Sequence, residues 1–123
     1  MLDSAPLLQE STFPAISRGK LQTVQVNLGY LCNLSCVHCH VNAGPKRTEL
    51  MSKATIDQVL AYAVASGATT LDLTGGAPEM NPHFYYCVVE ARKLGLKVID
   101  RCNLVILQEP GYEGLAAFLA EHQ

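Results

Sequence analysis

Apolar and polar residues alternate in short segments along the chain. Thr23–Leu28 and Thr69–Thr74 both alternate strictly, so each is predicted to be a strand with one apolar and one polar face. Leu96–Asp100 is expected to be a third strand.

Apolar residues at helical spacing follow each strand. The first helix is predicted to begin after Ser52 as N-cap and to end at Gly67. Its expected apolar stripe is Ile56, Val59, Leu60, Ala63 and Val64. A second helix is predicted after Asn81 as N-cap and ends at Gly95. The buried residues expected of the second and last helices are Phe84, Cys87, Val88, Ala91, Leu115, Phe118 and Leu119.

Three β/α units in succession predict an α/β fold with a parallel sheet and right-handed crossovers. The polar faces of the first two strands fit the lumen of a TIM-like barrel, so we expect half of such a barrel over residues 21–123. Residues 1–20 show no sustained period and are interpreted as a leader or arm. The leader has four apolar residues that could pack on the domain: Leu7, Leu8, Phe13 and Ile16.

Composition narrows the function classes. The chain has 123 residues, 49% of them apolar and 16% charged, and a net charge of -2, which predicts one domain and no nucleic-acid partner. Val59–Ala65 is the longest apolar run and is too short to cross a membrane. The first 20 residues show no secretory signal, and an odd count of five cysteines argues against a disulfide framework. A cytoplasmic location is therefore expected.

The strongest chemical signal is the group Cys32, Cys36 and Cys39 directly after the first strand. Three thiolates on one loop can hold three irons of a [4Fe-4S] cluster, leaving the fourth iron open to a small molecule with an amino and a carboxylate group. A closed zinc site with His38 or His40 as fourth ligand is the main alternative, and unligated thiols are another.

Further candidate residues follow the second and third strands. Gly75 and Gly76 allow a ligand to approach the backbone, although an ordinary strand-to-helix turn also explains them. Asn103 could face a cofactor or be a turn residue beside a paired Asp100 and Arg101, and Cys102 is a candidate substrate-side thiol. By contrast, Cys87 is interpreted as a core residue because it lies in a helical apolar stripe. Lys46 and Arg47 could offset the charge of a thiolate-ligated cluster or simply be solvated.

The amino-acid sequences of five segments resemble those of one protein family. These segments are Gly29–Asn33, Cys36–Pro45, Leu73–Glu79, Asn81–Phe84 and Val98–Asn103. They are similar to the N-terminal part of the Cys-rich radical S-adenosylmethionine (SAM) family associated with arsenosugar biosynthesis. The resemblance implies a [4Fe-4S] cluster, SAM as cofactor, a small-molecule substrate and an external electron donor. It further implies reductive cleavage of SAM to a 5′-deoxyadenosyl radical and transfer of the adenosyl group to a methylated arsenic(III) compound.

The resemblance also implies roles for single residues. Gly75 and Gly76 would meet the methionyl amino group of SAM, and His38 could stack on adenine or be a solvated loop residue. The family's usual glutamate directly after the glycines is replaced by Ala77, and Glu79 follows two residues later. Asn103 resembles an asparagine that faces the cofactor in several radical SAM families.

Length is the feature that departs from the resemblance. Family members carry a longer partial barrel and a cysteine-rich C-terminal region, whereas this chain ends after three β/α units. Two further hypotheses follow. The chain could be a non-catalytic iron-sulfur or zinc binding module, or an interaction fragment that associates with itself through the open edge of its barrel.

Overall fold

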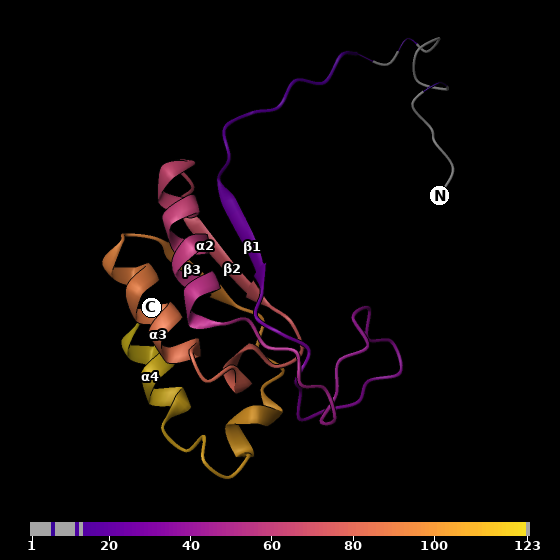
Figure 1. Ribbon diagram of the computed structural model, residues 1–123, viewed down its shortest axis with the longest axis vertical. Helices are drawn as coiled ribbons and strands as arrows, with labels where there is room; N and C mark the ends of the chain where they lie inside the picture. The colour runs from indigo at the N-terminus through magenta and orange to yellow at the C-terminus, as the bar shows by residue number, and fades with distance from the viewer. Residues whose placement is uncertain (1–5, 7–11, 13, 123) are drawn as a thin grey trace.

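The computed structural model describes residues 6, 12 and 14–122. Three β/α units follow one another in the chain, as Figure 1 shows. The elements are β1 (Thr23–Asn27), α2 (Lys53–Ala65), β2 (Thr70–Thr74), the 3-10 turn η1 (Pro78–Met80), α3 (Phe84–Lys93), β3 (Lys97–Asp100), the 3-10 turn η2 (Val105–Gln108) and α4 (Leu115–Glu121). The predicted α/β class and element order are confirmed.

The three strands form one parallel sheet in the order β1-β2-β3. Val26 of β1 pairs with Leu73 of β2, and Leu73 pairs in turn with Asp100 of β3. Side chains in register share a face, so the apolar face of β1 and β2 continues onto β3 and includes Asp100. This open sheet with its connecting helices agrees with the expected half of a TIM-like barrel.

The helices cover the apolar face of the sheet (Figure 1), and the main core lies between the two layers. Leu71 and Leu73 are fully buried at 0% exposure, as are Phe84 and Leu115 from the helices. Cys87 is 2% exposed and burial raises its thiol pKa to about 11, which agrees with its interpretation as a core residue. Val64 was expected in the core but is 49% exposed, because α2 turns that position toward solvent.

Local signals set both ends of α2 as predicted. The Ser52 hydroxyl accepts the N–H of Thr55 at 3.2 Å, and Gly67 follows the helix at a φ of +73°. The prediction for α3 was wrong in detail, since the helix begins at Phe84 with His83 as its cap residue.

Asn81 has a tertiary role instead of capping α3. It is 2% exposed, and its side-chain N–H groups donate to the carbonyls of Leu28 at 2.8 Å and Met51 at 2.9 Å. Its side-chain oxygen accepts the N–H of His83 at 2.8 Å. One buried amide thus joins the end of β1, the start of α2 and the approach to α3.

Residues 14–22 lead to β1 without regular structure and are exposed. Ile16, one of the predicted packing residues of the leader, is 81% exposed and so does not pack on the domain. The other three, Leu7, Leu8 and Phe13, lie outside the described residues.

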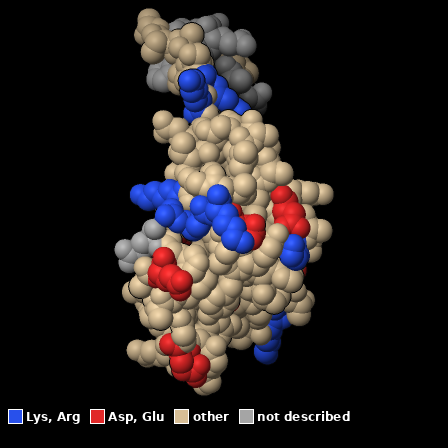
Figure 2. Space-filling model, turned by 90° about the vertical axis from the view of Figure 1, so that its left-hand side faces the viewer, with Lys and Arg blue, Asp and Glu red and all other residues tan. Residues whose placement is uncertain are grey.

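No helix in the described part of the chain combines the length and the hydropathy needed to span a bilayer. The face drawn in Figure 2 carries a short band of basic side chains with acidic side chains beside and below it, and most of its area is uncharged.

Candidate functional site

The cysteine loop, residues 28–52, connects β1 to α2, and hydrogen bonds hold its two ends together. Its two ends are joined where Tyr30 donates its N–H to Glu49 O at 2.9 Å and Met51 donates to Leu28 O at 2.9 Å. Further in, Gly44 donates its backbone N–H to Tyr30 O at 3.0 Å. The loop is therefore anchored at the carboxyl end of a parallel strand, where α/β folds place their sites.

The three loop cysteines differ in exposure. Cys32 is 7% exposed, Cys39 is half-buried and Cys36 is exposed. The Cys32 sulfur accepts the N–H of Leu34 at 3.4 Å, and the Cys39 sulfur accepts the N–H of Ala43 at 3.3 Å. Backbone N–H groups of Ala43 and Val41 hold the pKa of Cys39 below its ordinary value. Because metals bind thiolates, these N–H groups favour the metal-binding form.

The turn after β2 packs directly against the cysteine loop. A Cβ on Gly76 would collide with Leu31 O and lie 2.9 Å from Cys32 Cβ, so only glycine fits. Gly75 has a φ of +144°, which favours glycine as well. The N–H groups of Gly76 and Ala77 donate to the carbonyls of Gly29 and Leu31, each at 2.9 Å. The two glycines predicted from the sequence thus lie beside the first cysteine.

Ala77 and Glu79 have different surroundings. Ala77 is 3% exposed and packs in a small apolar cluster with Cys32 and Ala43. Glu79 is also 3% exposed, and its carboxylate lies among side chains that follow β3, as described below.

Asn103 also reaches the cysteine loop. Its side-chain nitrogen lies 3.8 Å from the Cys32 sulfur and donates to Asn33 Oδ1 at 2.8 Å. Asn33 in turn donates to Glu109 Oε1 at 3.1 Å, and Asn103 Oδ1 accepts the N–H of Ile106 at 3.0 Å. This chain of hydrogen bonds links the segment after β3 to the cysteine loop, and sequence reasoning did not foresee Asn33 or Glu109 in it.

The remaining loop candidates lie on the surface. His38 is exposed beside Cys39. Arg47 pairs with Glu49 at 2.8 Å and lies 4.7 Å above the centre of the Tyr30 ring, and its hydrogen bond lowers the pKa of Glu49 to about 2. Arg47 therefore links Tyr30 and Glu49, which lie near the two ends of the cysteine loop.

The polar face of the sheet carries a network of hydrogen bonds centred on Asp72. Arg101 pairs with Asp72 through two hydrogen bonds of 2.8 and 2.7 Å, whereas Asp100 had been considered as its partner. Gln25 donates to the same carboxylate at 3.2 Å. The Arg101 guanidinium holds the pKa of Asp72 below its ordinary value. Alternation explains the correction, because Asp100 and Arg101 point to opposite faces of β3.

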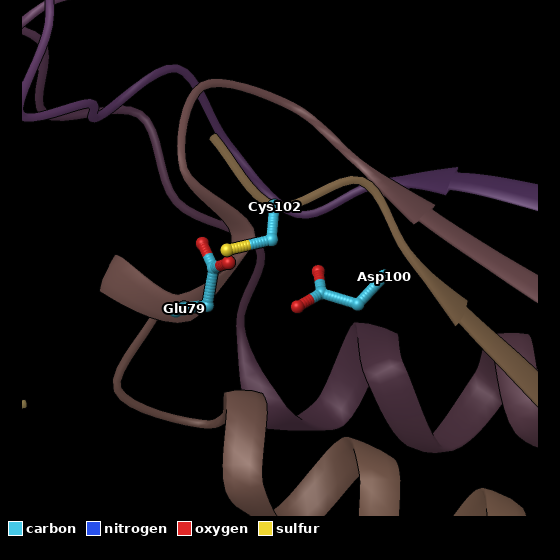
Figure 3. Close-up of side chains that lie close together, drawn as sticks. All are labelled: Glu79, Asp100 and Cys102. Carbon is cyan, nitrogen blue, oxygen red and sulfur yellow. The ribbon is translucent and has the colours of Figure 1, made fainter. Parts of the chain in front are cut away.

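On the helix side, Glu79, Asp100 and Cys102 point toward one another (Figure 3). One ligand atom from each lies within 4.8 Å of the others, and in the described part of the chain no other set of three His, Cys, Asp or Glu residues does so. Burial, followed by the charge of Glu79, raises the pKa of Asp100 to about 8, and burial is the main cause that raises the pKa of Cys102 to about 12. No pattern in the sequence groups these three residues, although Asp100 shares the alternation of Leu96 and Val98.

Comparison with known proteins identifies the family. The model of the radical SAM superfamily matches residues 26–122, which is most of the 123-residue chain. Probable GTP 3′,8-cyclases are among the similar proteins. The one from Sulfurisphaera tokodaii is 27% identical over 80 residues, which is 65% of this chain and 26% of that protein. The one from Sulfolobus acidocaldarius is 25% identical over 81 residues, which is 66% of this chain and 26% of that protein.

The chain thus spans about a quarter of the length of these relatives. Radical SAM domains use a [4Fe-4S] cluster and SAM. The open parallel sheet, the thiol-bearing loop after its first strand and the match over residues 26–122 agree with one another. The chain belongs to the radical SAM superfamily.

Proposed function

We propose that this chain is the cluster-binding part of a radical SAM enzyme, with Cys32, Cys36 and Cys39 as ligands of the [4Fe-4S] cluster. The observation that carries this proposal is the packing of Gly76 against Leu31 and Cys32, which joins the glycine turn to the cysteine loop without room for a side chain. An ordinary strand-to-helix turn, the alternative explanation of the two glycines, does not require this contact with the cysteine loop.

The donor set fits the cluster. Three cysteines on one loop offer one thiolate to each of three irons, and two of the sulfurs accept backbone N–H groups. These sulfurs do not gather within the 4.8 Å that marks a compact single-ion site. When bound, the cluster supplies the electron that cleaves SAM to a 5′-deoxyadenosyl radical.

The glycine turn suits the methionine end of SAM for a specific reason. The N–H groups of Gly76 and Ala77 are used inside the protein, so the backbone offers carbonyl oxygens to a ligand. An ammonium group needs acceptors, and carbonyl oxygens provide them. We assign this contact to Gly75 and Gly76.

Asn103 and His38 complete the proposed cofactor site. Asn103 touches both Cys32 and Asn33, so its amide is held near the cluster ligands. His38 is exposed next to Cys39 and is free to stack on an adenine ring. Glu79 faces Asp100 and Cys102, and we assign it no contact with SAM.

For the acceptor, we propose a methylated arsenic(III) compound that receives the adenosyl group. The support is the spelling of Cys36–Pro45 and Leu73–Glu79, which resembles the arsenosugar family. GTP is the second candidate, because the similar proteins include probable GTP 3′,8-cyclases. Incubating the reconstituted protein with either compound, SAM and a reductant distinguishes them by the adenosylated or cyclised product.

Anaerobic reconstitution tests the cluster itself. The chain is loaded with iron and sulfide, reduced and studied by electron paramagnetic resonance with and without SAM, and 5′-deoxyadenosine is assayed. We expect a cubane signal that changes on addition of SAM and is lost in Cys36→Ser. Cys87→Ala, which removes a core thiol away from the loop, is the control and should keep the signal.

Zinc uptake without a cubane would overturn the cluster assignment and favour the zinc module. A cubane that ignores SAM would reduce the proposal to a non-catalytic iron-sulfur module. A signal that survives Cys36→Ser would show that other residues hold the cluster.

Self-association is a separate part of the proposal. In the described part of the chain, β1 and β3 each pair with one strand only, so each has a free edge. Unpaired strand edges favour pairing with another chain. We propose that the free edge of β3 supports association of two copies.

A further inference from the structure

A second group of metal-binding residue types lies on the opposite side of the sheet from the Asp72 network. Glu79 comes from η1, Asp100 is the last residue of β3, and Cys102 lies in the segment that follows β3. Figure 3 shows their side chains converging. Their ligand atoms lie within 4.8 Å of one another. Three separate chain positions thus supply two carboxylates and a thiol to one point.

In the part of the chain that the structure describes, the oxygen atoms of both carboxylates are buried and have no hydrogen-bond partner. Glu79 is 3% exposed, and neither oxygen of Glu79 or of Asp100 has a hydrogen-bond partner in the described structure. A buried carboxylate without a partner is costly, and two facing each other are costlier still because like charges repel. A cation at this point would neutralise the two carboxylates and give a partner to their four oxygen atoms.

The fold itself holds Asp100 in this position. Asp100 is in register with Leu73, so its side chain must lie on the helix-facing side of the sheet. Turning it to the polar face would move Val98 out of the core as well. The carboxylate cannot move to the polar face without breaking the register of β3.

We propose that Glu79, Asp100 and Cys102 bind a thiophilic divalent cation of the zinc class. Zinc takes cysteine sulfur together with carboxylate oxygen, and three protein ligands are typical of sites that keep a fourth position open. The site is distinct from the cysteine loop and does not depend on the proposed function.

The surroundings leave room for the fourth ligand. A hollow of about 230 Å³ adjoins the site and is lined by Val88, Val98, Asp100, Cys102, Leu119 and His122. The Nδ1 atom of His122 donates to Phe118 O at 2.9 Å, so its Nε2 atom carries the lone pair. Water can occupy the open position, and His122 lines the same hollow. The Cys102 sulfur also accepts the N–H of Leu104 at 3.3 Å, a contact that partly offsets the burial that raises the pKa of this thiol.

Cobalt(II) is the probe, because its bond to a thiolate gives a charge-transfer absorption band that zinc lacks. The full chain carrying Cys32→Ser, Cys36→Ser and Cys39→Ser removes the loop thiols and isolates the second group. We expect one cobalt ion per chain with a thiolate band, and zinc should displace it.

Three variants on this background locate the ion. Cys102→Ser should abolish the thiolate band, and Glu79→Gln should weaken binding by more than about tenfold, because both remove a ligand. Cys87→Ala, the control, should leave band and affinity unchanged. Far-ultraviolet circular dichroism verifies that each variant is folded.

A measurement on the unmodified chain covers the case in which a variant does not fold. Zinc should protect Cys102 from alkylation, as read by peptide mass spectrometry. Absence of cobalt binding, a band that persists in Cys102→Ser, or alkylation of Cys102 that zinc does not change would each overturn the proposal. The two carboxyl groups would then share a proton in place of a metal.

Discussion

At the scale of single residues, a glycine contributes to the geometry of the site as much as the thiols do. Gly76 lies so close to Leu31 O and Cys32 that no Cβ fits between them. The position of the first cysteine is thus coupled to the turn after β2, although the two are far apart in the sequence. A substitution of Gly76 should therefore impair cluster binding by the cysteine loop.

Gly76→Ala tests this coupling. Overpacking against the Leu31 carbonyl should lower the free energy of unfolding by about 1 to 3 kcal/mol and reduce the iron content after reconstitution. Chemical denaturation and iron analysis measure the two effects. Gly114→Ala is the control, because a Cβ there meets nothing within 4 Å. Equal behaviour of the two variants would contradict the coupling.

Asn81 is the second residue with an effect beyond its neighbours. Asn81→Ala removes two hydrogen bonds to the Leu28 and Met51 carbonyls and one from His83 N–H. The buried groups left behind should cost about 2 to 4 kcal/mol of stability, measured by urea denaturation. Gln58→Ala on the exposed side of α2 should change stability by less than about 0.5 kcal/mol. A loss at Asn81 no larger than this would show that the amide is dispensable.

At the scale of the elements, the polar face of the sheet is held by charge. Asp72 on β2 binds Gln25 of β1 and Arg101 at the end of β3, so one carboxylate links all three strands. Its pKa is lowered mainly by Arg101, so this contribution to stability is present above the ordinary pKa of aspartate. The contribution is lost as the pH falls through the lowered value of the folded state.

Asp72→Asn should therefore be less stable than the unmodified chain at neutral pH. It should also lose less stability than the unmodified chain when the pH falls below about 4, because the titrating group has gone. Thermal unfolding across a pH series measures both. Glu121→Gln, at the exposed end of α4, is the control and should follow the unmodified chain. An unchanged slope in Asp72→Asn would contradict the role of this carboxylate.

At the scale of the whole molecule, the open sheet is the dominant feature. The helices cover one face (Figure 1), while among the described residues β3 pairs with β2 alone, and Ile99 of β3 is 39% exposed. Exposed strand edges and apolar residues together favour association with another chain.

Ile99→Lys should therefore weaken self-association. A charge on the edge strand opposes pairing, so sedimentation velocity should show less dimer than for the unmodified chain at the same concentration. Val64→Lys is the control, because Val64 is 49% exposed on α2 away from that edge. A monomeric unmodified chain, or an equal loss in both variants, would contradict association through β3.

Particular residues show how far the sequence could lead. Strict alternation was enough to place Leu71 and Leu73 in the core, and cysteine spacing was enough to select the loop. The role of Asn81 was mistaken because an asparagine before Pro82 also satisfies the local rules for a helix cap. Nothing local showed that its amide would meet two distant carbonyls.

What the sequence by itself determined is local or periodic: the three strands, the extent of α2, the buried thiol of Cys87 and the grouping of three thiols on one loop. These follow from spacing along one segment, where side-chain direction is set by the backbone period. The tertiary structure alone decided that Arg101 pairs with Asp72, that Asn103 reaches Cys32, and that Glu79 meets Asp100 and Cys102. Each of these contacts depends on the register between parallel strands and on where a loop returns, and no single segment encodes either.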